Sequence, residues 1–94
     1  MNTKNRDDLI KYIYMALSSN EYLSYAEIVN YIENHLNVSL DCYDFPISAV
    51  KNVILDYGIY RDGAKSKRFR GNVLFIANEK KDSRQNNQIK WKKI

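Results

Sequence analysis

The sequence holds few of the residues that build disulfides, metal centres and membrane spans. Its 94 residues include one cysteine, Cys42, and one histidine, His35. A lone cysteine excludes an internal disulfide and favours a reducing, cytoplasmic setting. The longest run free of polar residues and tyrosine is 73–77, whereas a membrane helix needs about 20 apolar residues. The N-terminal residues also lack the apolar stretch of a signal peptide, so we expect an intracellular protein without a membrane partner.

Catalytic and metal-binding patterns are equally sparse. His35 and Cys42 lie seven residues apart with no other soft ligand nearby, so no zinc site is expected. The chain has no glycine-rich phosphate loop and no serine–histidine–aspartate set, which are the usual signatures of nucleotide and acyl chemistry. The neighbouring carboxylates of Asp7 and Asp8 are explained by helix capping. We therefore expect a protein that is not an enzyme and that needs neither a cofactor nor a metal.

Charge is what the chain has in quantity, and its two signs lie in different parts of the sequence. Residues 1–60 hold four Lys or Arg against eight Asp or Glu, a net charge of −4. Residues 61–94 hold eleven Lys or Arg against three Asp or Glu, a net charge of +8. A basic end on an acidic, apolar-patterned body indicates contact with a polyanion, most simply nucleic acid, through one part of the surface.

Apolar residues at helical spacing predict two helices in the first part of the chain. The first begins at Asp7 or Asp8, whose carboxylates can cap free backbone N–H groups. The second, over about 25–36, has the clearest start signal. Ser24 is followed three residues later by Glu27, the spacing of a capping box in which each side chain bonds the other residue's backbone N–H.

The spacing of apolar residues changes from helical to extended at Gly58. A third helix is predicted from Pro46, which suits a first helical turn, to Gly58, where a C-cap with positive φ is expected. Beyond it, residues 59–61 and 72–77 have the composition of short strands. A glycine-bounded basic loop separates them, which predicts an antiparallel β-hairpin with a long, positively charged tip.

This order of three helices, strand, basic loop and strand resembles the winged helix-turn-helix superfamily. The likeness is carried by residues 22–28, similar to the opening of the family's second helix, by 47–54, similar to its recognition helix, and by 57–59 with 67–73, similar to the start of the wing and its return strand. The resemblance implies an α+β fold, with a winged-helix domain over 1–77 and a basic C-terminal tail over 78–94. It also implies DNA binding by a regulator of transcription, or by an accessory factor of replication or of a mobile element.

The predicted wing is the first candidate site for nucleic acid. Five cations lie within ten residues: Arg61, Lys65, Lys67, Arg68 and Arg70. Such groups bind phosphate because the contact releases condensed counterions. Phe69, between two of them, offers a ring for stacking on a base or wedging into a groove. The alternative is a solvated hairpin tip whose charge prevents edge-to-edge sheet pairing.

The third helix is a second, thinner candidate. Its outward residues are expected to be Ser48, Lys51, Asn52 and Asp56. Asn52 and Lys51 suit the edges of adenine and guanine, while Asp56 would repel phosphate. Contacts to the backbone of double- or single-stranded DNA are therefore expected to dominate, with modest sequence discrimination. An ordinary exposed helix face is the alternative.

The last residues alternate between apolar and basic. Ile89 and Trp91 would share one face of an edge strand, and Lys90 and Lys92 the other. Three roles stay open for this segment. It can pack on the wing sheet, add to the sheet edge of a partner, or contribute Lys90 and Lys92 to nucleic-acid binding.

Tyrosines on the acidic part of the chain support a second hypothesis. Tyr14 and Tyr31 are expected on exposed helix faces, where tyrosine favours interfaces, although tyrosines at the rim of the core would look the same. With Ile89 and Trp91 they would form the partner-binding surface of a protein-interaction module. Such a module would be a homodimer, or a subunit or inhibitor of a nucleoprotein complex.

Overall fold

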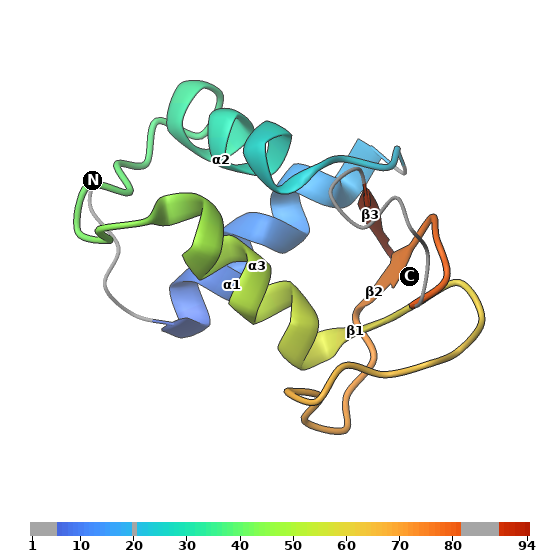
Figure 1. The fold of residues 1–94 in the computed structure, drawn as a ribbon. Helices are drawn as coiled ribbons and strands as arrows, with labels where there is room; N and C mark the ends of the chain where they lie inside the picture. Colours follow the sequence, from blue (N-terminus) through green and yellow to red (C-terminus); the bar gives the residue numbers. More distant parts are fainter. Residues whose placement is uncertain (1–5, 20, 82–88) are drawn as a thin grey trace.

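The structure, a computed structural model, describes residues 6–19, 21–81 and 89–94. This part of the chain is a small α+β domain (Figure 1). Its helices are α1 (Arg6–Ala16), a 3-10 turn η1 (Leu17–Ser19), α2 (Tyr25–Asn34) and α3 (Pro46–Tyr57). Its strands β1 (Gly58–Ile59), β2 (Phe75–Ala77) and β3 (Trp91–Lys93) form one sheet in the order β1-β2-β3.

The capping box predicted for α2 is confirmed. The Glu27 backbone N–H donates to Ser24 Oγ at 3.2 Å, and the Ser24 backbone N–H donates to Glu27 Oε1 at 3.0 Å. The hydrogen bond from the Ser24 N–H holds the pKa of the Glu27 carboxyl below its usual value, because it favours the charged form. The helix ends at Asn34, two residues earlier than predicted.

Gly58 is the C-cap of α3, as predicted, but the positive φ expected for it is wrong. Its backbone is extended, with φ −119° and ψ 154°, and the chain passes directly from α3 into β1. The need for glycine comes from crowding instead. A Cβ atom here would lie 2.6 Å from Trp91 Cζ3 and 2.7 Å from the Ile54 carbonyl oxygen.

The predicted antiparallel hairpin over 59–61 and 72–77 is also wrong. β1 and β2 are parallel, with Gly58 opposite Phe75 and Ile59 opposite Ile76. Residues 60–74 therefore cross over between parallel strands, which needs a long connection. The antiparallel partner of β2 is β3, in the C-terminal segment. Local composition predicted strands near 59 and at 75–77, but not their parallel orientation and not the pairing of β2 with β3.

The C-terminal segment is part of the domain and not an appended tail. Trp91 is fully buried, and Ile89 is 4% exposed. Trp91 Nε1 donates to Tyr25 Oη at 2.9 Å, and Leu23 and Trp91 exchange two backbone hydrogen bonds of 2.8 Å. Of the three roles left open for this segment, packing on the sheet is confirmed.

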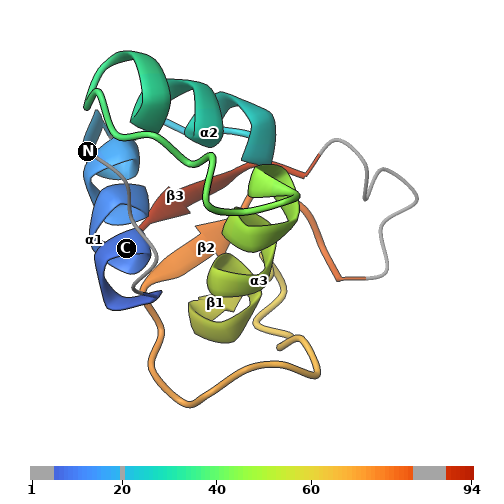
Figure 2. The same cartoon turned by 90° about the vertical axis from the view of Figure 1, so that its left-hand side faces the viewer.

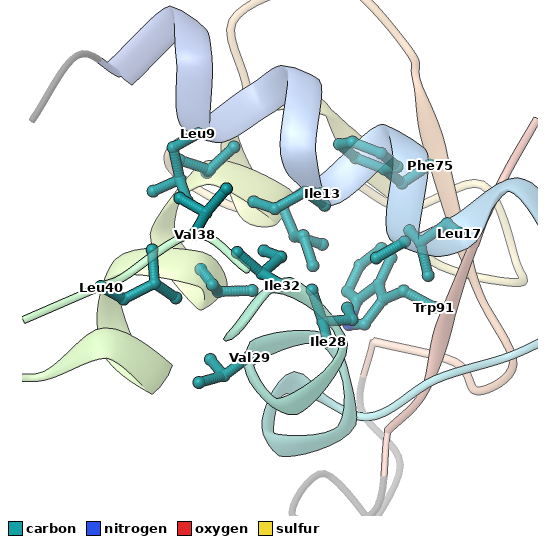
Figure 3. Packing of buried hydrophobic residues seen from close by; sticks show 14 of the residues in the cluster. Leu9, Ile13, Leu17, Ile28, Val29, Ile32, Val38, Leu40, Phe75 and Trp91 are labelled. Atoms are coloured by element: carbon teal, nitrogen blue, oxygen red, sulfur yellow. The ribbon is translucent and has the colours of Figure 1, made fainter. Parts of the chain in front are cut away.

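The core lies between the helices and the sheet. Leu17 of η1 and Ile28 of α2 point toward the indole of Trp91, while Leu9 and Ile13 of α1 meet side chains of α2 and of the loop after it (Figure 3). Burial raises the pKa of the Tyr25 hydroxyl, beside the same indole, to about 12. Figures 1 and 2 place α2 at one end of the domain and most of loop 60–74 at the opposite end.

Candidate nucleic-acid interface

Residues 60–74, named the basic loop from here on, are fastened to the C-terminal end of α3. The last carbonyl groups of a helix have no partner within it. The loop supplies three donors to them: Ser66 Oγ to the Leu55 oxygen (2.8 Å), Arg70 N to the Asp56 oxygen (2.8 Å) and Leu74 N to the Tyr57 oxygen (2.7 Å). The path of the basic loop is thus set by the end of α3 as well as by the sheet.

Asp56 was expected on the outer face of α3, and this prediction is wrong. Its side chain is 1% exposed and lies under the basic loop. Arg68 Nε donates to Asp56 Oδ1 at 3.1 Å, and Arg70 Nε lies 3.6 Å from Oδ2. A buried carboxylate is stable only when it is paired. The carboxylate expected to repel phosphate is thus covered by two arginines.

The cations of the basic loop are exposed to solvent. Arg61, Lys65 and Lys67 are exposed, and the side chains of Arg68 and Arg70 keep 45% and 59% of their surface accessible. Phe69 is half-buried, and Lys65 Nζ lies 5.0 Å from the centre of its ring, the distance of a cation–π contact. One ring face is thus already occupied by a lysine.

A second basic segment runs beside the loop. The Arg61 N–H donates to the Glu79 carbonyl oxygen at 3.0 Å, and Lys81 Nζ donates to the Lys65 carbonyl oxygen at 2.8 Å. Lys80, between them in the sequence, is exposed. The sequence interpretation missed Lys80 and Lys81, although a lysine pair in the basic half of the chain was a usable signal.

The outer face of α3 agrees with the prediction at three positions. Ser48, Lys51 and Asn52 are all exposed. α3 and the start of the basic loop, drawn in yellow after β1, lie on the side of the domain away from α1 (Figure 2). Lys51 precedes Asp56, on the last turn of the helix, by about 8 Å along the helix axis, since each residue rises about 1.5 Å.

Lys90 and Lys92 of the C-terminal segment contact other parts of the domain. Lys90 Nζ lies 3.4 Å from Glu27 Oε1 at the start of α2, and Lys92 Nζ lies 4.9 Å from the ring centre of Tyr22. Tyr22 precedes α2 and Glu27 lies in its first turn, so neither partner belongs to the basic loop. The structure does not place these lysines with the loop cations.

Of the four residues predicted to form a partner-binding surface, two are buried in the domain's own core. Ile89 and Trp91 face the core of their own domain, so their assignment to a partner is wrong. Tyr14 is 38% exposed, and Lys93 Nζ lies 5.3 Å from its ring centre. Tyr31 is half-buried and stacks on His35, with ring centres 4.7 Å apart. Tyr14 thus borders the sheet, whereas Tyr31 lies along α2.

An exposed apolar pair at the start of α3 was missed by the sequence interpretation. Phe45 is 75% exposed and Ile47 48% exposed. Its helical spacing with Val50 predicts that Ile47 is buried, and this prediction is wrong, since Ile47 lies in the first turn of α3, outside the core. Asp41 and Asp44, both exposed, precede the pair. This end of α3 is therefore acidic and apolar, and the other end is basic.

Two further kinds of feature would bear on function, a membrane-spanning helix and a cluster of metal ligands. Within 6–19, 21–81 and 89–94, no helix is long and apolar enough to cross a membrane. The same residues contain no group of three or more His, Cys, Asp or Glu side chains that could hold a metal ion. Comparisons with known protein families, with curated proteins and with solved structures give no match to this chain.

Proposed function

We propose that this protein binds nucleic acid, through a surface that we name the cationic face. It consists of seven side chains: Arg61, Lys65, Lys67, Arg68, Arg70, Lys80 and Lys81. The observation that carries the proposal is that these cations belong to two segments tied together by hydrogen bonds. Within the same segments only Asp62 and Glu79 are acidic. A surface of this charge attracts phosphate oxygens and gains free energy from released counterions.

The topology supports a winged-helix assignment for the domain. The antiparallel bridge between Leu23 and Trp91 precedes α2 and α3, and the β2–β3 hairpin follows them. This is the element order of winged-helix domains, in which the hairpin connection is the wing. In this assignment the basic loop is an insertion between α3 and β2. The protein would then be a regulator, or an accessory factor of replication or of a mobile element, with Ser48, Lys51 and Asn52 of α3 beside the bound nucleic acid.

A salt titration tests the proposal. With five or six phosphate contacts, the logarithm of affinity should fall against the logarithm of salt concentration with a slope of roughly −5. The assay is fluorescence anisotropy of a labelled mixed-sequence duplex, and of its single strand, between about 50 and about 200 mM salt. If neither probe binds at the lowest salt concentration, nucleic acid is rejected as the ligand.

Charge reversal locates the contact surface. Lys67→Glu and Lys65→Glu remove exposed cations without touching Asp56, and each should weaken binding and make the salt slope about one unit shallower. The matched control is Lys11→Glu, which changes the net charge equally on the exposed side of α1. An equal loss in the control variant would mean that only net charge matters and that the cationic face is not the site.

A second candidate is protein–protein contact at the start of α3. The exposed Phe45 and Ile47 beside Asp41 and Asp44 offer an acidic, apolar surface. The cationic face of a second copy, next to the 39% exposed Val73, has the complementary charge. Sedimentation of the full chain at rising concentration should show self-association that Phe45→Ser and high salt both reduce. A monomer at all concentrations rejects this candidate.

A further inference from the structure

Asp56, Arg68 and Arg70 form a charge cluster in which one carboxylate serves two guanidinium groups. Neutralising a buried carboxylate takes a single cation, so the cluster keeps one net positive charge. The carboxylate is 1% exposed, while the arginine side chains are 45% and 59% exposed. The excess positive charge therefore lies on the solvent side of the cluster, within the cationic face.

Both arginines are held at their backbone as well as at their side chains. The Arg68 N–H donates to Ser66 Oγ at 3.2 Å, and the Arg70 N–H donates to the Asp56 carbonyl oxygen at 2.8 Å. Each side chain then meets the Asp56 carboxylate through its Nε atom. Asp56 itself is on the last turn of α3, where it is fixed by the helix.

A guanidinium group has five N–H donors on a rigid plane. Contact with a carboxylate through Nε leaves the terminal NH₂ groups pointing along other edges of that plane, with the geometry that matches phosphate oxygens. A free arginine side chain samples many rotamers and loses that entropy when a ligand fixes it. A pair already ordered by Asp56 does not lose that entropy again on binding.

We infer that Arg68 and Arg70, oriented by the positioning residue Asp56, form a preorganised site for a backbone phosphate of nucleic acid. The inference deepens the proposed function and rests on it for the identity of the ligand. It distinguishes these two arginines from the other cations of the face, which act through charge alone.

Replacing arginine by lysine separates geometry from charge. The double variant Arg68→Lys/Arg70→Lys keeps the net charge but loses the planar fork, so affinity for the labelled duplex should fall on the order of tenfold. Its salt slope should not change, since the number of cations is the same. The matched control is Arg6→Lys, an arginine of α1 outside the cationic face, which should bind like the wild type. Equal affinities for the double variant and the control would overturn the inference.

The variant Asp56→Asn tests the role of Asp56, because positioning and simple electrostatic attraction predict opposite changes in affinity. The variant makes the domain more positive by one charge, so simple electrostatic attraction predicts tighter binding to the duplex. Loss of positioning predicts weaker binding by several-fold. Tighter binding by a folded variant would overturn the role of Asp56. If the variant does not fold, as a thermal melt would reveal, the lysine variants decide the question.

A phosphate titration keeps the inference separate from the proposed function. In the full-length protein, the Nε–H signals of Arg68 and Arg70 should be resolved by NMR and should shift when inorganic pyrophosphate is added. The signal of Arg61 should move less. Such shifts in a protein that binds neither duplex nor single strand would reject nucleic acid as the ligand and retain the phosphate site. Unmoved arginine signals, despite tight binding to DNA, would reject the site and retain the function.

Discussion

Gly58 links the end of α3, the first strand and the C-terminal segment, and Gly58→Ala is the sharpest perturbation of that link. The glycine has φ −119°, a value that alanine adopts without strain. The cost is therefore steric. The added Cβ would lie 2.6 Å from Trp91 Cζ3 and 2.7 Å from the Ile54 carbonyl oxygen, whereas ordinary contacts begin at 3.4 Å. The carbonyl belongs to the backbone of α3 and the indole is fully buried, so a shift of either group costs free energy.

Overpacking of a filled core costs about 1–3 kcal/mol. Because both neighbours are rigid, we expect a loss of about 2 kcal/mol in the free energy of unfolding, which lowers Tm by roughly 8–16 °C in a domain of this size. Urea denaturation and a thermal melt followed by circular dichroism measure the two quantities. A change below about 0.5 kcal/mol, the usual range for a surface substitution, would refute the steric argument.

A double-mutant cycle with Trp91→Phe shows whether the indole causes the cost. The smaller ring opens space beside position 58, so Gly58→Ala should be less harmful in the Trp91→Phe background, by about 0.5–1 kcal/mol or more. Gly63→Ala is the matched control. Gly63 has φ +84° and nothing within 4 Å of an added Cβ, so its cost is conformational and should not couple to Trp91. Additive effects at Gly58 would contradict the proposed contact.

Two further predictions concern groups with displaced pKa values. Tyr25→Phe should cost about 1–3 kcal/mol because the buried indole N–H of Trp91 loses its acceptor. The pKa of Tyr25 is raised to about 12, so its contribution to stability is complete below pH 10 and falls by up to about 3 kcal/mol as the pH rises to about 12. Urea unfolding at alkaline pH should show this decline in the wild type and less of it in Tyr25→Phe; equal declines would contradict the assignment. The pKa of Glu27 is lowered from 4.5, so the capping box stabilises the fold above that pH and the stabilisation is lost as the pH falls through the lowered value. Glu27→Ala, which removes the carboxylate acceptor of the Ser24 backbone N–H, should cost about 0.5–1.5 kcal/mol at neutral pH and less in acid, and a cost independent of pH would contradict the role of the carboxylate.

The helices followed from the sequence because their signals are local. The capping box at Ser24 and Glu27 and the apolar spacing of α2 act within one or two turns, so a single chain segment carries the whole signal. The pairing of β1 with β2 depends on contacts between segments that lie apart in the sequence, so neither segment alone carries its signal. Residues 58–59 align in parallel with 75–76, and β3, from the end of the chain, pairs with the other edge of β2.

The alternation of apolar and basic residues in the last six positions left three roles open. Ile89 and Trp91 on one face fit a strand packed on its own domain as well as one offered to a partner. What decides between them is the acceptor for the indole N–H, Tyr25 Oη, and the space left by Gly58. Both lie more than 30 residues away in the sequence, so nothing near Trp91 could reveal them.

The position of the cationic face was predictable even though the strand pairing was not. Arg61 and Arg70 follow the last residue of α3 by 4 and 13 positions, so a short chain tethers the intervening cations to that end of the helix whatever strand forms. The helix dipole favours cations there. By the same rule an aspartate in the last turn is unfavourable on its own. Asp56, followed by an arginine-rich segment, was thus a signal in the sequence that this carboxylate has a cationic partner, and a buried Asp–Arg–Arg cluster is the arrangement that resolves it.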